Sequence, residues 1–141
     1  MSGTSTYQQV TITERSNAPP GERIRAVGMC FYGRGQDLTT DNLYRLKRNP
    51  SNPKDDNCIE LTENGIVKAT MNARLSKLMA PLIDNAIIRE PECRVLEDAI
   101  WSRGDTRRPA RAHKVEAKFI ASLTDLELVQ DVFKAYNVNF V

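Results

Sequence analysis

Side chains that could perform acid–base chemistry are few in this chain of 141 residues, and they are not arranged as catalytic groups. The single histidine, His113, lies among basic residues without a nearby carboxylate, so it is a poor general base and is expected at the surface or in a groove. The pair Asp55–Asp56 lies in a predicted turn, where aspartates usually bond their own backbone. The sequence has neither a glycine-rich phosphate loop nor a G-x-S-x-G motif. These observations argue against an enzyme.

The cysteines also fail to form a recognisable site. Cys30, Cys58 and Cys93 are odd in number and include no C-x-x-C pair. We therefore expect neither a disulfide scaffold nor a zinc site, and no cofactor or metal. Cys30 and Cys58 fall in strand-like runs and are interpreted as small core residues rather than nucleophiles.

Positive charge is concentrated in two segments. Residues 23–54 hold seven basic and two acidic residues, residues 101–118 hold six and two, and residues 55–100 carry an excess of acidic residues. If the fold brings the two basic segments together, they form a patch suited to a polyanion such as nucleic acid. The alternative is that each segment is a solvated face or loop.

An aromatic pair, Phe31–Tyr32, ends a predicted strand in the first basic segment, just before Gly33. Adjacent residues on a strand point to opposite faces, so one ring can enter the core while the other faces outward. An exposed ring among basic side chains is a stacking platform for single-stranded nucleic acid. The nearby cations are Arg34, Arg45, Arg48 and Lys54. The alternative is that both rings belong to the core.

The elements that must position these residues are short strands and two helices. Apolar and β-branched runs predict strands over residues 8–13, 24–32, 43–48, 58–61, 66–70, 87–101 (one or two strands), 112–121 and 138–141. Apolar residues at helical spacing predict helices over residues 73–84 and 125–136. This order favours a small barrel or an α+β sheet over a doubly wound fold.

The length corresponds to one domain at about 150 residues per domain. Residues 1–21 are polar and end in Ala18-Pro19-Pro20-Gly21, so we predict a flexible N-terminal arm or a loosely attached strand, followed by the domain over 22–141. No apolar run approaches the length of a membrane span, and the first residues do not resemble a secretory signal. The sequence therefore predicts an intracellular protein, in the nucleus or cytoplasm, without a membrane partner.

Three motifs, in this order, resemble the HIRAN domain. They are Val27-Gly28-Met29-Cys30-Phe31-Tyr32, then RNPSNPKDDNCI over residues 48–59, then Asn64-Gly65-Ile66-Val67 followed by an amphipathic helix. The family pattern is roughly V-G-x-x-[FY]-[YE], then L-x-R-x-P-x-N-P-x-D-x-N-A-I, then a glycine turn. The second motif is the most specific, and the resemblance covers residues 23–141.

The resemblance implies an α+β, mostly β fold: an OB-like small β-barrel of about six strands with two helices, which binds the 3′ end of single-stranded DNA. It implies that the aromatic pair stacks on the terminal bases and that the N-P-x-D turn lies at the 3′-hydroxyl. It also implies that backbone phosphate lies at the start of the first helix, where a free N-terminus attracts anions. The candidate nucleic-acid-binding residues are Phe31, Tyr32, Arg34, Arg48, Asn52, Lys54, Asp55, Thr70, Asn72 and Arg111.

Three of these positions depart from the family pattern. Cys30 stands where an arginine often precedes the aromatic pair, Thr70 replaces a histidine or tyrosine, and Arg111 falls near an aromatic that flanks the terminal base. A second interpretation therefore stays open: a barrel of the same fold that has lost DNA binding and acts as a protein-interaction or structural domain. No helicase, nuclease or RING segment is present, so we expect binding without remodelling, alongside a protein partner that supplies catalytic activity.

The placement of charge discriminates between these two interpretations. A DNA-binding module should have its cations along one groove around Tyr32, whereas a barrel with another role should have them scattered. The cations concerned are Arg34, Arg48, Lys54 and Arg111.

Overall fold

The structure is a computed structural model that describes residues 6–15, 17, 18, 23–29, 37–102, 110–134, 136 and 138–140. Within these residues the chain forms short strands and two helices. In chain order they are β1 (Tyr7–Glu14), β2 (Arg25–Val27), β3 (Leu43–Arg48), β4 (Ile59–Glu63), β5 (Ile66–Met71), α1 (Ala73–Asp84), β6 (Ile88–Val95), β7 (Ile100–Ser102), β8 (Ala110–Ser122), α2 (Leu126–Lys134) and β9 (Val138–Phe140). Neither of these two helices is long and apolar enough to cross a membrane.

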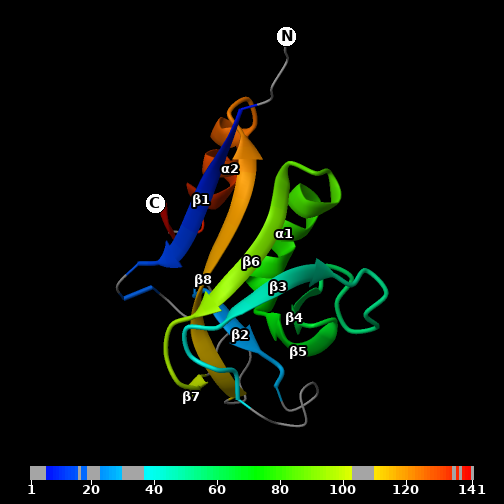
Figure 1. The fold of residues 1–141 in the computed structure, drawn as a ribbon, viewed down its shortest axis with the longest axis vertical. Coiled ribbons are helices and arrows are strands. Elements are labelled where there is room, and N and C mark those ends of the chain that lie inside the picture. The colour runs from blue at the N-terminus through cyan, green and yellow to red at the C-terminus, as the bar shows by residue number, and fades with distance from the viewer. Residues whose placement is uncertain are drawn as a thin grey trace.

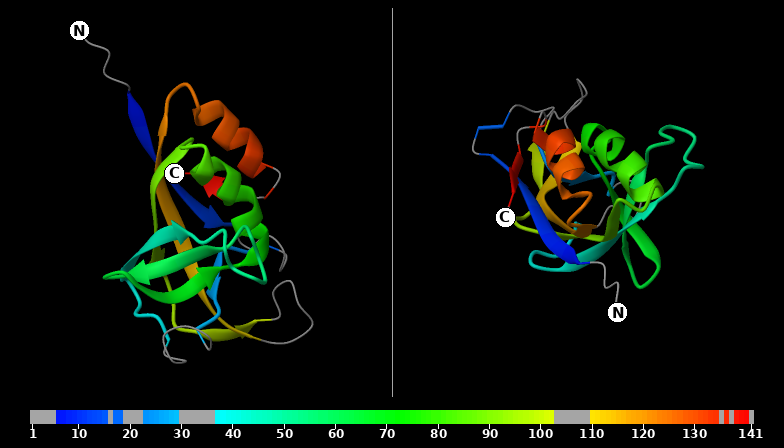
Figure 2. Two further views of the ribbon diagram at one scale, coloured as in Figure 1. Left: turned by 90° about the vertical axis from the view of Figure 1, so that its right-hand side faces the viewer. Right: turned by 90° about the horizontal axis from the view of Figure 1, so that it is seen from above.

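Six antiparallel strands close into a barrel in the order β2-β5-β4-β3-β6-β8, because β8 pairs with β2 as well as with β6. β1 and β9 extend the sheet beyond β8, and β7 pairs with the start of β8 (Figure 1). The two helices lie side by side next to the barrel (Figure 2). The predicted OB-like barrel of about six strands with two helices is therefore confirmed.

The long strand β8 organises the barrel, since it pairs with β1, β2, β6 and β7. Every second side chain from His113 to Ala121 is buried, and the side chains between them are partly exposed. This alternation follows from the two-residue period of a strand with one face on the core. The strand is long enough to connect the closed barrel with the extra strand β1.

The N-terminal strand β1 lies within the segment predicted as an arm. It pairs with β8 from Tyr7 opposite Ser122 to Ile12 opposite Ala117, and its last residues pair with β9. Val10 and Ile12 are buried in the core because alternate side chains of β1 point inward. Of the two expectations for this segment, the structure therefore shows the strand for residues 7–14, as a regular part of the sheet.

Both helices place apolar side chains on the core. The range of α1 agrees with the prediction, and its buried face includes Leu75, Met79 and Leu82, while Leu78 is only partly buried. In α2, which is shorter than predicted, Val129 and Phe133 are fully buried. The Phe133 ring stacks on Phe119 of β8 with 6.1 Å between the ring centroids. This stacking connects α2 to the sheet.

The C-terminus of α1 offers a prediction about stability. Ala86 has φ 56°, and its N–H donates to the Ile83 carbonyl at 3.0 Å, while the Ile87 N–H donates to the Leu82 carbonyl at 2.9 Å. This is a Schellman motif with alanine where glycine is usual. The left-handed conformation costs an L-residue about 1–2 kcal/mol, and glycine loses about 0.5–1 kcal/mol more backbone entropy on folding.

We therefore expect Ala86→Gly to raise the free energy of unfolding by about 0.5–1 kcal/mol in urea titrations. Ala80→Gly, in the interior of the same helix, should lower the free energy of unfolding. A decrease in both variants would contradict the assignment of the C-terminal motif.

Candidate functional site

A groove of about 460 Å³ gathers part of the predicted site. It lies where the loop between β3 and β4 meets β2, β5 and the start of α1, and we term it the loop groove. Its lining residues are Val27, Gly28, Asn52, Pro53, Lys54, Asp55, Cys58, Thr70, Met71 and Ala73. Four of these were predicted from the sequence, namely Asn52, Lys54, Asp55 and Thr70.

The loop between β3 and β4 is held by its own side chains. The Asn52 Oδ1 accepts hydrogen bonds from the backbone N–H groups of Lys54 (2.8 Å) and Asp55 (3.2 Å), and its Nδ2 donates to the Cys58 sulfur at 3.6 Å. Asn and Asp residues favour such turns because their side chains can replace backbone hydrogen-bond partners. Asn52 therefore fixes the shape of the groove wall.

The Asp55 carboxylate is half-buried at this wall. Its Oδ1 accepts the Asn57 N–H at 2.9 Å. Within the part of the chain that the structure describes, no donor is bonded to Oδ2. One carboxylate oxygen thus orders the turn, and the other can accept an N–H or O–H from a ligand.

The helix α1 begins at the opposite wall with Ala73. Asn72 occupies the N-cap position, but its side chain does not cap the helix. Instead its Oδ1 accepts the Arg25 N–H and its Nδ2 donates to the Tyr136 hydroxyl, both at 3.2 Å. The predicted site residue Asn72 is therefore buried between β2 and the end of α2, and the uncapped, positive end of α1 lies at the groove.

Gly28 was not predicted as a lining residue, although it belongs to the Val-Gly pair of the first motif. Its φ of 79° lies in the left-handed region, where an L-residue would be strained. Here β2 ends beside β5, with Val27 paired to Thr70 and the Thr70 hydroxyl donating to the Val27 carbonyl at 3.5 Å. The conformation of Gly28 thus ends β2 at the floor of the groove.

Arg48 does not line the groove, because its donors are bonded to backbone and carboxylate groups. Its Nε and Nη2 donate to the Asp84 carboxylate at 3.0 and 3.2 Å, and its Nη1 and Nη2 donate to the carbonyls of Cys58 (2.7 Å) and Asp56 (2.9 Å). Arg48 therefore holds the loop between β3 and β4 against the end of α1.

Phe31, Tyr32 and Arg34 lie outside the described residues. Arg111, on β8, donates to both oxygens of the Asp37 carboxylate, with 3.1 Å between Nε and Oδ1. These hydrogen bonds lower the pKa of the Asp37 carboxyl below its ordinary value. Arg111 does not line the loop groove. Four cations were expected to lie along one groove if the chain binds DNA. Lys54 lies in the loop groove, whereas Arg48 and Arg111 are paired with carboxylates outside it. Arg34 lies outside the described residues.

His113 is fully buried, so the expectation of a surface or groove histidine is wrong. Its Nε2 accepts the Leu38 N–H and its Nδ1–H donates to the Glu97 carbonyl, both at 2.9 Å. With both ring nitrogens bonded, a neutral imidazole can be buried without leaving a polar atom unsatisfied. The ring joins the segment before β3 to the segment after β6.

The described cysteines are buried thiols. Cys58 lines the loop groove, and Cys93 lies in β6. Burial raises the pKa of both thiols. Thiols of this kind are poor nucleophiles at neutral pH. No group of three metal-binding side chains occurs in the described ranges.

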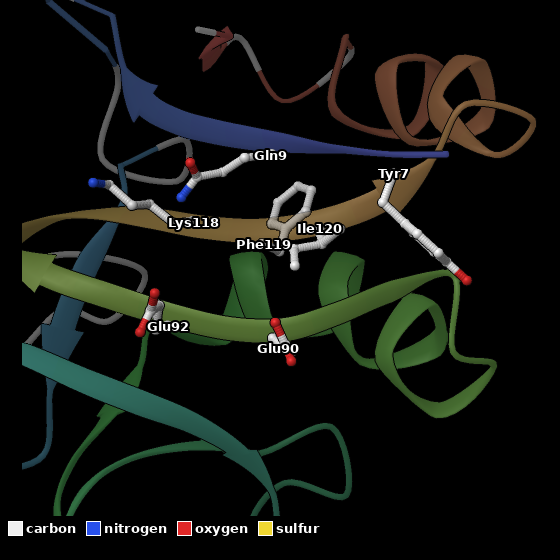
Figure 3. A pocket seen from close by; sticks show the side chains of 7 residues that line it. All are labelled: Tyr7, Gln9, Glu90, Glu92, Lys118, Phe119 and Ile120. Atoms are coloured by element: carbon white, nitrogen blue, oxygen red, sulfur yellow. The ribbon is translucent and has the colours of Figure 1, made fainter. Parts of the chain in front are cut away.

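A second hollow, of about 360 Å³, lies on the outer face of β1, β8 and β6 (Figure 3). It contains none of the predicted site residues. Tyr7 and Gln9 of β1, Glu90 and Glu92 of β6 and Lys118 of β8 line it, together with Phe119 and Ile120. Two carboxylates beside one lysine do not suit a polyanion.

The arrangement of the strands defines the chain as a small OB-like barrel. Comparison with solved structures shows which kind of OB-like barrel it is similar to. No protein-family model and no curated protein sequence matches the chain. The fold is similar to that of the HIRAN domain of human HLTF, seen by crystallography (TM-score 0.63, 22% identity, 81% of this chain and 86% of that chain).

Two NMR structures of the HLTF HIRAN domain agree with this result. One has a TM-score of 0.60 at 20% identity, covering 81% of this chain and 86% of that chain. The other, of the domain in its DNA-bound conformation, has a TM-score of 0.53 at 20% identity, covering 79% of this chain and 84% of that chain. The chain therefore has the HIRAN fold.

Proposed function

We propose that this chain is a nucleic-acid-binding module that receives the 3′ end of single-stranded DNA in the loop groove, without catalysing a reaction. The observation that carries the proposal is the loop groove itself. It places the Asp55 carboxylate, Lys54 and the positive end of α1 around one hollow. The likeness to a HIRAN domain in its DNA-bound conformation supports it.

Each group has a distinct role in this proposal. Asp55 Oδ2 accepts a hydrogen bond from the terminal 3′-hydroxyl, because a carboxylate is a strong acceptor for an O–H donor. Lys54 and the first N–H groups of α1 face the backbone phosphates. Phe31 and Tyr32 stack on the terminal bases, with Arg34 beside them. Arg48 and Asn52 act on the ligand only through the shape of the loop.

The proposal predicts a preference for the chemistry of the strand end. A 3′-phosphate would place negative charge against Asp55, whereas a 3′-hydroxyl donates to it. One charge-assisted hydrogen bond is worth about 1.5–3 kcal/mol. We therefore expect the affinity for the 3′-hydroxyl strand to exceed that for the 3′-phosphate strand by about tenfold or more. Asp55→Asn should reduce this ratio severalfold, since it removes the repulsion. Fluorescence anisotropy measures this affinity ratio, with oligonucleotides of one sequence that end in a 3′-hydroxyl or a 3′-phosphate.

The adjacent residue provides a matched control for this experiment. Asp56 is exposed and is not among the residues lining the groove, so Asp56→Asn should leave the ratio unchanged. If Asp55→Asn also leaves it unchanged, Asp55 only orders its own turn. If the wild-type protein binds no single strand even at low salt, the proposed function is wrong.

Salt dependence tests the role of Lys54. Removing one phosphate contact should lower the slope of log K against log salt by about 0.7 for a single strand. We expect Lys54→Ala to weaken binding to all sequences similarly and to reduce the slope by this amount. Lys47→Ala, on an exposed position of β3 outside the groove lining, should not change the slope. Equal slopes for both variants would show that Lys54 makes no phosphate contact.

The pairing of Arg48 and Arg111 favours a second candidate function. Both guanidinium groups are bonded to carboxylates of the chain rather than placed in the groove. A HIRAN-like barrel that had lost DNA binding and acted as a protein-interaction or structural domain would have this distribution of charge. The absence of binding to any single strand at low salt would select this alternative.

A further inference from the structure

The helix α1 carries its charges in the opposite order from the one that stabilises a helix. Its two cations, Arg74 and Lys77, lie in its first half, and its one carboxylate, Asp84, lies in its last turn. The helix macrodipole favours anions at the N-terminus and cations at the C-terminus. In the same molecule α2 has the favourable order, with Glu127 in its first turn and Lys134 in its last. The cations of α1 are therefore not placed for the stability of the helix.

The three charges of α1 differ in whether the fold explains them. The Asp84 carboxylate accepts the Nε and Nη2 donors of Arg48 at 3.0 and 3.2 Å, so it serves to hold the loop between β3 and β4. Side chains three or four positions apart are neighbours on a helix, and no acidic residue stands at that spacing from Arg74 or Lys77. The two cations are themselves three positions apart, which sets like charges side by side. Their placement calls for an anion from outside the helix.

The exposed residues of α1 form one stripe along the helix, which we term the α1 stripe. It consists of Ala73, Arg74, Lys77, Pro81 and Asp84. At one end Ala73 lines the loop groove, and at the other end Asp84 binds Arg48, which holds the loop between β3 and β4. Because both ends of the stripe adjoin this loop, Lys77 lies at the rim of the loop groove, about one helical turn from Ala73.

We infer that the α1 stripe is the path of the DNA strand upstream of its 3′ end, with Arg74 and Lys77 facing the phosphates that follow the terminal nucleotide. This inference rests on the proposed function, and it extends the site from the loop groove onto the surface of α1. The occupant is the strand itself, because two neighbouring cations without an adjacent acid attract phosphate. The hollow on β1, β8 and β6 instead presents Glu90 and Glu92, which repel it.

Neutral linkages placed one at a time in the strand test this path. A methylphosphonate removes the charge of one phosphate, and it is set at the first, second or third linkage from the 3′-hydroxyl of one oligonucleotide. The wild-type protein should bind strands with a neutral second or third linkage about two- to fivefold more weakly, the range of one exposed ion pair. Lys77→Ala should weaken binding of the unmodified strand by a similar factor. At one of these two linkages, neutralisation should cost this variant no further affinity.

Three other variants are matched to Lys77→Ala. Lys77→Arg keeps the charge and should bind all strands as the wild-type protein does. Lys54→Ala, inside the loop groove, should keep its sensitivity to the neutral second and third linkages. Lys47→Ala removes an exposed lysine outside the groove lining and should respond to each neutral linkage as the wild-type protein does. Lys77→Ala should not lower the melting temperature, since alanine is the better helix former.

Two results would overturn the inference while leaving the proposed function intact. One is a wild-type protein that binds the unmodified strand but loses no affinity with a neutral second or third linkage. The other is a Lys77→Ala variant that is as sensitive as the wild-type protein at both linkages. A wild-type protein that binds no single strand at low salt would instead contradict the proposed function itself.

Discussion

Phe133→Ala should lower the free energy of unfolding by about 3–5 kcal/mol, the range for removing a buried aromatic ring. Phe133 is fully buried and stacks on Phe119 of β8, so its truncation removes this ring contact and leaves a cavity between α2 and β8. Urea or thermal unfolding followed by circular dichroism measures the change.

Leu128→Ala is the matched control on the same helix. This side chain is 46% exposed, so its removal should change stability by no more than about 0.5 kcal/mol. A comparable loss of stability in both variants would mean that the face of α2 with Val129 and Phe133 is not the buried one. The loss of stability for Leu78→Ala in α1 should lie between those of the other two variants, because Leu78 is only partly buried against the core.

Glu14→Gln should have a similarly large effect, about 3 kcal/mol. The Glu14 carboxylate accepts the Arg25 Nη1 donor at 2.8 Å and the Ile24 N–H at 3.2 Å, and the Glu14 and Arg25 side chains are 7% and 11% exposed. Neutralising Glu14 leaves a buried guanidinium without its counter-charge, which is the costly way to break an ion pair. Urea unfolding at neutral pH measures the loss.

Two further variants separate this burial effect from the general loss of a charge. Glu116→Gln breaks a pair in which the Arg94 side chain is 41% exposed, so its cost should stay below about 1 kcal/mol. Arg25→Met in the Glu14→Gln background should recover most of the lost stability, because it removes the uncompensated cation. No recovery would mean that the lost stability comes from other contacts of Glu14, which include the Ile24 N–H at 3.2 Å and the Lys114 Nζ at 3.8 Å.

The elements whose signals are local in the sequence were predicted well. Strand β3, helix α1 and the hairpin at Asn64–Gly65 follow from apolar periodicity and from turn residues that accept positive φ values, here 54° and 80°. The turn predicted at Asp55 is also present, held by hydrogen bonds from backbone N–H groups to the side chains of Asn52 and Asp55. In each case neighbouring residues contain the physical cause.

The features that could not be predicted from the sequence depend on residues that are far apart in the chain. Arg48 meets Asp84, and Arg111 meets Asp37, only because the barrel closes, so two predicted ligand contacts are ion-paired within the chain. The burial of His113 requires the Leu38 N–H as donor and the Glu97 carbonyl as acceptor, and these come from separate loops. A strand signal at residues 8–13 was visible, but its burial depends on β8 and could not be read locally.

The pairing of β1 with β8 also sets the order of events during synthesis. Tyr7 pairs with Ser122 of β8, and β8 completes the barrel by pairing with β2. Neither pairing can form until almost the whole chain has left the ribosome. At about 5–20 residues per second, the nascent N-terminal strand waits on the order of ten seconds. During that interval both edges of this strand are open and it carries no charge before Glu14, so it is exposed to wrong association. Chains stalled before residue 110 lack β8 and should remain in that state.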